Sequence, residues 1–323
     1  MSRKTDSLKH QLRVKALETA NDNETKKVYR RSCDAFAEWA KAEGIKQLSE
    51  ITKDVLQAYE QHLEQRPENY SASTIHSKLA GVCKATGISM KEISKPKRTA
   101  KTIRRGRSET KTGRGEKELN NPKYARLVDL QKAVGIRRAE LEKLTGSDLI
   151  RDKHGNVAYI KVRRGKGGKE TLQWLLPEDR ETVESIFSGV KPDEKVFSGE
   201  EMSNHLNLHK LRAEHAKNTY DYFVRLLEAH PERAERLRTV LLKRWEDGHK
   251  DLLNENPKRY EHARRKFVAD MDDRPYKLRG ENLQKAKDLG LPEEYNRLAI
   301  MATSVLALSH WRNDVSIVNY LVQ

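Results

Sequence analysis

The spacing of hydrophobic positions predicts a small helical domain over residues 23–93. Apolar side chains recur three and four positions apart in three stretches, which is the spacing of one buried helix face. Gly44 and Gly87 follow the first and third stretches as stop signals, and Thr52 stands where the second needs an N-cap. Four short helices would make one compact bundle. The expected inward positions are Val28, Ser32, Phe36, Trp39, Ala40, Val55, Leu56, Tyr59, Leu63, Ile75, Leu79 and Val82, with Met90 and Ile93 in a last turn.

Residues 118–216 predict a mixed arrangement of helices and strands. Helical spacing appears before and after Gly135. The runs VAYIKV (157–162) and TLQWLL (171–176) flank a Gly-rich turn, which is the pattern of a β-hairpin, and a helix is expected at about 179–188. The fold class expected is therefore mainly α with a small β-hairpin or sheet.

Residues 217–296 are helical in pattern and rich in charge. Proline follows His230, Asn256 and Arg274, and each of these dipeptides predicts a break. A final helix with a broad apolar surface is expected at about 293–308.

Two segments lack a clear apolar pattern. Residues 1–22 are polar and basic, with Leu8, Leu12 and Leu17 hinting at a short helix, and we favour a frayed tail over an arm that touches DNA. Residues 94–117 hold ten Lys or Arg against two Glu, which predicts a linker. Such a linker is either simply solvated or placed to follow a phosphate backbone.

The composition adds a large excess of positive charge to this picture. The chain has 323 residues, enough for two domains with real cores, and 64 Lys plus Arg against 48 Asp plus Glu give a formal charge of +16. An excess of this size suits a polyanionic partner, although a highly soluble charged surface would explain it as well.

The two cysteines, Cys33 and Cys83, stand among apolar residues and are expected to be buried thiols. CxxC and HExxH patterns do not occur, so neither a zinc site nor a redox site is predicted. The N-terminal sequence has no apolar signal region, and no apolar run approaches a membrane span. We therefore expect a cytoplasmic protein with no membrane contact, associated with the nucleoid when bound to DNA.

Candidate chemistry comes from four short phrases: GIRRAEL, RRGKGGK, HKLRAEHA and ALSHWRNDVSIVNYL. The residues in them that matter are Arg137, Lys166, His209, Arg212, His310 and Tyr320. Two guanidiniums can clamp the oxygens of an attacked phosphate, and a positioned Lys or His can protonate a leaving oxygen. A tyrosine can form a covalent intermediate, so the set fits phosphodiester transesterification without a metal or other cofactor. Each phrase alone is more often a surface or packing feature.

In this order the phrases resemble those of the tyrosine recombinase (phage integrase) family. The resemblance implies a core-binding, SAM-like domain at 23–93 and a mixed α+β catalytic domain at 118–323, together forming a C-shaped clamp on duplex DNA. It implies that Tyr320 attacks the scissile phosphate while Arg137 and Arg212 hold its charge. Lys166 would protonate the leaving oxygen, with Lys169 as a fallback. The supporting residues implied are His209 and His310 for the remaining protons and Glu140 beside the first arginine.

The function implied is that of a site-specific recombinase, an enzyme that integrates or excises a mobile element through a 3′-phosphotyrosyl intermediate. The expected partners are a specific duplex DNA site and a homotetramer on two duplexes, with an accessory excision factor as a further candidate. A type IB topoisomerase-like relaxase and an inactive DNA-binding regulator on the same scaffold are the alternatives. The expected DNA-binding residues are Lys95, Lys97, Arg98, Lys101, Arg104, Arg105, Arg107, Arg163, Arg164 and Lys169.

The sequence departs from the family pattern at three places. Residues 217–296 look like a helical insertion, which would contact DNA, contact a neighbouring protomer or be a solvated face. Within it, His262 and Arg265 form a second HxxR phrase, less favoured than the first. Ser309 replaces the usual glycine before the histidine, and the following spacing to Tyr320 is one residue longer than the commonest. Only three residues follow Tyr320, where many members extend a segment into a neighbouring subunit.

Overall fold

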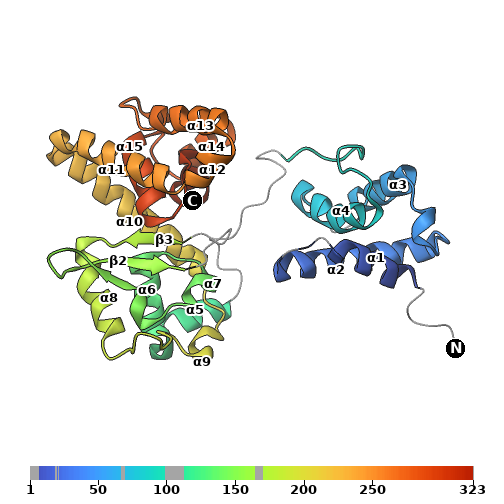
Figure 1. Cartoon of the computed structure of the whole chain (residues 1–323), viewed down its shortest axis with the longest axis horizontal. Helices are drawn as coiled ribbons and strands as arrows, with labels where there is room; N and C mark the ends of the chain where they lie inside the picture. The colour runs from blue at the N-terminus through green and yellow to red at the C-terminus, as the bar shows by residue number, and fades with distance from the viewer. Residues whose placement is uncertain are drawn as a thin grey trace. The chain divides into compact units, whose positions relative to one another are not determined.

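The computed structural model describes residues 7–18, 20, 22–66, 70–98, 113–163 and 170–322. The chain divides into two compact units, residues 1–104 and residues 105–323, which we call the N-terminal and C-terminal units (Figure 1). Helices dominate both, and the described strands form two small sheets in the C-terminal unit. The expected fold class, mainly α with a small sheet, is confirmed at this level. No helix within the described ranges is both long enough and apolar enough to cross a bilayer.

The N-terminal unit is a helical bundle. Its helices are α1 (Leu8–Glu18), α2 (Asn23–Ala42), α3 (Lys53–Glu64) and α4 (Ala72–Thr86). The Thr52 hydroxyl accepts a hydrogen bond from the Val55 amide at 3.3 Å, so the predicted N-cap is confirmed. Ser71 caps α4 in the same way, and Gly87 ends that helix with a φ of 76°, a left-handed conformation that glycine adopts without strain.

Two predictions for this unit are wrong. Residues 8–18 are not a frayed tail, because Leu8, Leu12 and Ala16 of α1 are buried in the core of the bundle. The Arg13 guanidinium also holds both carboxylate oxygens of Asp34 on α2 at 2.6 Å. Val28, expected to point inward, is 42% exposed, because the helix face centred on Ser32 and Phe36 is the one that packs.

Both cysteines are free and buried, as predicted. Burial raises the pKa of the Cys33 thiol to about 12 and that of Cys83 to about 11. A thiol with so high a pKa stays protonated and unreactive at neutral pH, so these residues serve as packing groups.

The first half of the C-terminal unit surrounds a three-stranded antiparallel sheet of order β1-β2-β3. Its elements are α5 (Gly113–Leu119), α6 (Ala125–Val134), α7 (Arg138–Leu141), β1 (Leu149–Arg151), β2 (Val157–Val162), β3 (Thr171–Trp174), α8 (Arg180–Phe187) and α9 (Gly199–Met202). The predicted hairpin is confirmed, with Val162 paired to Thr171 and Tyr159 to Trp174. β1 was not predicted, since three residues with a register irregularity carry no alternating pattern.

Helix α10 (Leu208–Ala229) joins this half to the rest of the unit. The elements that follow are α11 (Ala234–Asp247), α12 (Lys250–Glu255), α13 (Pro257–Ala269), β4 (Tyr276–Lys277), α14 (Gly280–Asp288), β5 (Glu294–Tyr295), α15 (Arg297–Ala302) and α16 (Asn313–Ser316). In Figure 1, α11 to α15 gather on one side of α10, with the sheet, α6 and α8 on the other. The helical pattern of residues 217–296 and its three predicted breaks are observed, but α10 runs without a break through the expected boundary at 217.

The last predicted helix begins later than expected. Glu294 and Tyr295 pair as strand β5 with β4, and α15 starts only at Arg297, where the Asn296 side chain accepts from the Ala299 amide. A wide π-helical turn, Thr303–Ala307, continues α15. Its residues are all buried, which agrees with the broad apolar surface read from the sequence.

We expect Leu12→Ala to destabilise the N-terminal unit by about 2–5 kcal/mol, because the leucine side chain is fully buried between helices. Val14→Ala is the matched control on the same helix, since Val14 is 44% exposed, and it should change stability by less than about 0.5 kcal/mol. Amide hydrogen exchange of α2 and α4 in the full chain measures the effect. Equal exchange rates in the two variants would contradict this prediction and would mean that α1 does not stabilise the bundle.

Candidate active site

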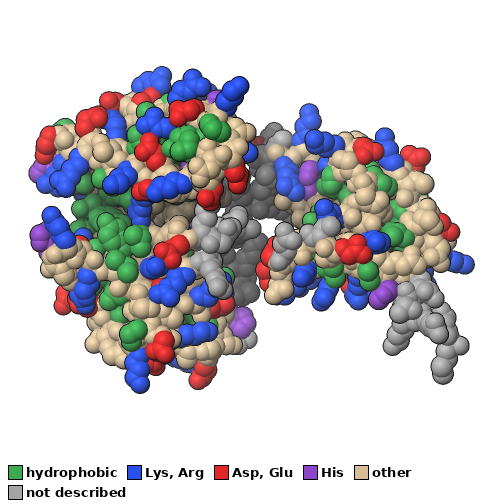
Figure 2. Space-filling view, in the orientation of Figure 1, with side chains coloured by type: hydrophobic (Ala, Val, Ile, Leu, Met, Phe, Trp, Pro, Cys, Tyr) green, Lys and Arg blue, Asp and Glu red, His purple; other side chains and the backbone are tan. Residues whose placement is uncertain are grey.

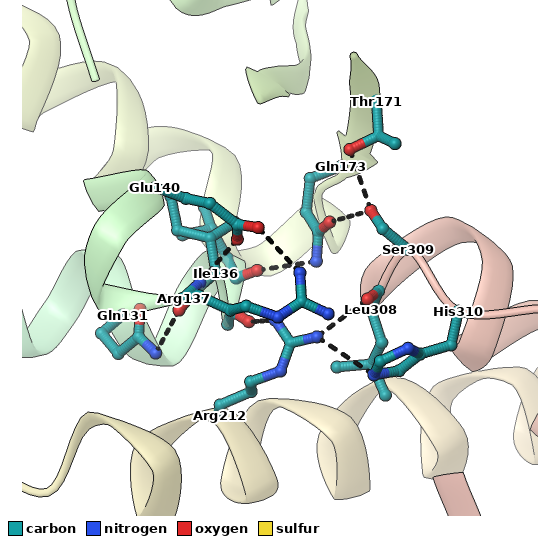
Figure 3. A network of polar contacts seen from close by, with 12 residues as sticks. Gln131, Ile136, Arg137, Glu140, Thr171, Gln173, Arg212, Leu308, Ser309 and His310 are labelled. Carbon is teal, nitrogen blue, oxygen red and sulfur yellow. Dashed lines mark hydrogen bonds and ion pairs between the residues drawn. The ribbon is translucent and has the colours of Figure 1, made fainter. Parts of the chain in front are cut away.

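The centre of the site is the guanidinium of Arg212, which is only 2% exposed on α10. Its Nε donates to the Tyr320 hydroxyl at 3.0 Å, and one Nη donates to the Leu308 carbonyl at 2.8 Å. The other Nη donates to the Gly135 carbonyl. One buried cation therefore ties together three segments that are distant in sequence, and Figure 3 shows part of this network.

Tyr320 lies among three of the other predicted residues. Its hydroxyl is 3.4 Å from His310 Nε2, and that nitrogen is 3.5 Å from an Nη of Arg212. The His209 ring lies 5.4 Å from the tyrosine ring, measured between centroids. Five of the six predicted catalytic residues are described, and four of those five, all but Arg137, contact one another around this hydroxyl. His262 and Arg265, the alternative pair, are exposed on α13.

A change of helix type puts Tyr320 in this position. After α16 the backbone widens into a π-helical turn, Ile317–Leu321, in which the Val322 amide donates to the Ile317 carbonyl at 3.0 Å. A π-helical turn holds about one residue more than an α-helical turn. The extra residue between His310 and Tyr320 therefore falls in a stretch of backbone that can take it up, and the tyrosine still reaches Arg212.

Arg137 opens α7 beside this network. The Glu140 carboxylate accepts from the Arg137 backbone amide at 2.7 Å and from its guanidinium at 2.7 Å, so one acidic side chain satisfies an amide at the start of the helix and also fixes the arginine side chain. The guanidiniums of Arg137 and Arg212 lie next to each other (Figure 3). Burial lowers the pKa of Arg212, and the positive charge of Arg137 lowers that pKa further, while Tyr320 acts in the opposite direction.

The charge balance of this pair favours an anion. Glu140 is already paired with Arg137, and among the described residues Arg212 has carbonyls, His310 and a phenol as partners rather than a carboxylate. The Glu140 charge also acts on Arg212, so the two guanidiniums share this one carboxylate. A bound oxyanion with several acceptor oxygens would balance the remaining positive charge. The arrangement can therefore hold a phosphate next to the Tyr320 hydroxyl.

Three residues that the sequence analysis missed hold the two arginines in place. Gln131 of α6 donates to the carbonyl of Ile136, immediately before Arg137, at 2.8 Å and to that of Leu208, immediately before the HKLR phrase, at 2.9 Å. Gly135 has a φ of 55°, and a Cβ there would collide with the His215 ring. Glycine next to the first arginine phrase was the one available signal for this close approach.

His215 packs under that turn as a neutral side chain. Its Nδ1 donates to the Lys132 carbonyl at 3.0 Å. Burial, and secondly the charge of Arg212, lower the pKa of His215 to about 4. His215 therefore has a structural role: it packs against the turn at Gly135 that precedes Arg137.

Ser309 has a φ of 52°, the one positive value outside glycine among the described residues. A side chain in this left-handed region costs on the order of 1 kcal/mol. Here the hydroxyl contacts the side-chain oxygens of Gln173 at 3.0 Å and Thr171 at 3.1 Å, both on β3. These contacts offset the strain and connect the segment before His310 to the sheet.

The remaining predicted residues are Lys166 and the DNA-binding candidates. Lys166, Arg164, Lys169, Lys101, Arg104, Arg105 and Arg107 lie outside the described residues. Arg163 is paired with Asp148 at 2.6 Å, and the Lys95 ammonium donates to the carbonyls of Met90 and Ile93, so both have partners within the chain. Lys97 and Arg98 are exposed.

Comparison with known proteins gives one family. Residues 10–101 match the family model of the phage integrase SAM-like domain. Among solved structures, a crystal structure titled as that of XerA recombinase is similar, with a TM-score of 0.24 and 18% identity, covering 65% of this chain and 82% of that chain. No curated protein matches. The family-model match covers the N-terminal helices, less than a third of the chain, and it is to a domain of the family that the motifs resemble.

We expect Ser309→Ala to destabilise the C-terminal unit by about 1–3 kcal/mol, because it keeps the left-handed backbone and loses both contacts to β3. Ser309→Gly loses the same contacts but relieves the backbone strain, so its cost should be smaller by roughly 1 kcal/mol. Denaturant unfolding of the two variants beside the parent measures the order. Glycine and alanine variants of equal stability would contradict this account.

We expect His215 to make the stability of the C-terminal unit depend on pH. Its pKa of about 4 lies below the ordinary value of 6.5, so the unfolded chain takes up a proton first as the pH falls. The contribution of His215 to the free energy of unfolding is therefore fully present above about pH 6.5. It is lost as the pH falls towards 4, by an amount on the order of 3 kcal/mol. His215→Gln should lose less stability between pH 7 and 4.5 than the parent does. Parallel pH profiles of unfolding would argue against a buried neutral histidine.

Proposed function

We propose that this protein is a site-specific DNA recombinase that cuts and rejoins duplex DNA through a covalent bond to Tyr320. The observation that carries the proposal is the pair of adjacent guanidiniums, Arg137 and Arg212, with the Tyr320 hydroxyl hydrogen-bonded to the buried one. Two fixed cations beside a nucleophile match the charge distribution of an attacked phosphodiester.

In the cleavage step the Tyr320 oxygen attacks phosphorus, and the bond to the 5′ oxygen breaks. The tyrosine proton passes to His310 or His209, whose rings are its neighbours. Arg137 and Arg212 hold the non-bridging oxygens, whose negative charge grows during the attack. Lys166 donates the proton that the leaving 5′ oxygen needs, so the products are a 3′-phosphotyrosyl bond and a free 5′ hydroxyl.

The rejoining step is the same reaction in reverse. A 5′ hydroxyl from the partner strand attacks phosphorus, and the tyrosine leaves with its proton returned. Because one phosphate ester replaces another, no external energy source is needed. Exchange of both strands of two duplexes would use four protomers, each contributing one tyrosine.

DNA binding by the rest of the chain follows from its charge and its first unit. The SAM-like domain that residues 10–101 match is the integrase module, and the basic segment predicted as a linker at 94–117 overlaps its end. The far boundary of that predicted linker is wrong, because helix α5 begins at Gly113. We propose that the two units enclose duplex DNA as a clamp, with the linker along the phosphate backbone. In this proposal the substrate is a site at the end of a mobile element, which the enzyme integrates or excises.

Covalent trapping tests the proposal. The protein is incubated in EDTA with duplexes from the DNA flanking its own gene, including a series nicked at successive positions so that a cut strand can diffuse away. We expect an adduct that resists detergent and is lost in Tyr320→Phe. Tyr222→Phe is the control, since Tyr222 packs on Trp174 away from Arg212.

The outcomes separate the alternatives. An adduct that survives Tyr320→Phe would place the nucleophile elsewhere and overturn the assignment. Tight binding without any adduct would favour an inactive DNA-binding regulator. Relaxation of supercoiled plasmid without exchange between sites would favour a topoisomerase-like enzyme.

A further inference from the structure

The insertion at residues 217–296 is nearly neutral in charge. It contains 18 Lys or Arg against 16 Asp or Glu, whereas the whole chain carries a net charge of +16. Figure 2 shows acidic and basic side chains interspersed on the face of the C-terminal unit that it presents. A surface of this kind is poorly suited to binding phosphates. The contacts of the insertion with the rest of the C-terminal unit therefore indicate its role better than its surface charge does.

One arginine of the insertion reaches the sheet beside the site. Arg244 of α11 donates from its guanidinium to the Leu172 carbonyl of β3, and the same group lies over the Tyr159 ring of β2 at 5.8 Å. β3 is an edge strand in the described sheet, so this carbonyl gains a partner from outside the sheet. Burial lowers the pKa of the Arg244 guanidinium, as expected for a group held against the strands.

The part of β3 that Arg244 contacts also holds Ser309, the residue before His310. Thr171 and Gln173 flank Leu172, and both contact the Ser309 hydroxyl. Ser309 precedes His310, whose Nε2 faces the Tyr320 hydroxyl. A shift of β3 at Leu172 would therefore be passed to His310 through one side chain.

The segment that carries His310 also packs against the C-terminal end of α11. Trp311, which follows His310, packs edge-on against His249 at 5.4 Å between centroids. Gly248 lies under it, and a Cβ at Gly248 would stand 3.2 Å from the Trp311 ring. Since Gly248 has an ordinary φ of −77°, the close approach of the tryptophan is what favours glycine there.

These contacts close a ring around a groove of about 270 Å³ whose lining includes Leu172, Arg244, Gly248, Ser309 and Trp311. We propose that the insertion is a built-in brace for the catalytic histidine, with Arg244 as a positioning residue that acts through β3 on His310. The proposal rests on the function proposed above for His310 and Tyr320. It assigns the inserted helices an intramolecular role, in place of a DNA surface or a contact between protomers.

Arg244→Ala in the full chain is the test, with Arg236→Ala as the matched control because Arg236 is exposed on the same helix. We expect Arg244→Ala to slow adduct formation on the nicked duplex about 10- to 100-fold, the scale of a misplaced catalytic group. DNA affinity and its dependence on salt should be unchanged in both variants. A weaker affinity with a shallower salt dependence would mean that Arg244 binds phosphate, which overturns the proposal.

A double-mutant cycle separates positioning from general destabilisation. If Arg244 acts through His310, then Arg244→Ala in a His310→Ala background should add less than about a twofold loss. A full additional loss in that background would also overturn the proposal, since it would show that the two residues act independently.

Hydrogen exchange gives a readout that does not depend on activity. Amides of residues 304–312 and 171–174 should exchange faster in Arg244→Ala and at the parental rate in Arg236→Ala. If the parent forms no adduct, the proposed recombinase function fails. In that case the hydrogen exchange of residues 304–312 and 171–174 alone decides whether Arg244 holds the segment around His310. Unchanged exchange in Arg244→Ala would refute the brace.

Discussion

The C-terminal unit depends on one buried cation. The Arg212 guanidinium bonds the Gly135 carbonyl, the Leu308 carbonyl and the Tyr320 hydroxyl, so it joins the turn before α7, the end of a π-helical turn and the last turn of the chain. Such a group is stable inside a protein only when its donors are satisfied. The same requirement that fixes the fold here leaves Tyr320, the proposed nucleophile, hydrogen-bonded to a positive charge. Stability and the proposed chemistry therefore share one side chain.

Two departures from the usual motif are accommodated locally. The additional residue before Tyr320 lies in a segment with a π-helical turn, where the backbone holds one residue more than an α-helix does. The serine before His310 keeps the left-handed backbone that glycine adopts freely, and β3 compensates through Thr171 and Gln173. In both cases the backbone path is retained while the means of holding it differ. This explains how an irregular motif can still bring His310 and Tyr320 together.

The helices of residues 217–296, predicted to be an insertion, are part of the core of the unit. Phe223 and Leu227 of α10 pack in one cluster with Leu241 and Trp245 of α11 and with the α15 residues Leu298 and Met301. Trp174 of β3 packs on Tyr222 and Phe223, which brings the sheet into the same assembly. An insertion built in this way cannot move without disturbing the segments that carry the site. Its near-neutral charge and its contacts are consistent with an internal role.

The sequence by itself determined the helical bundle, the hairpin, the buried thiols and the list of residues to examine, because these follow from local periodicity, capping groups and residue chemistry. It did not reveal that α1 packs in the core, that β5 precedes the last helix, or that Gln131 and His215 support the arginine phrases. Those features depend on contacts between residues far apart in the chain, and the spacing of Leu8 and Leu12 indicates a helix without showing what it packs against. The sequence already favoured Arg212 over Arg265, but only the tertiary structure decided that Arg212 meets Tyr320, since that contact depends on where α10 packs against the turn that carries the tyrosine.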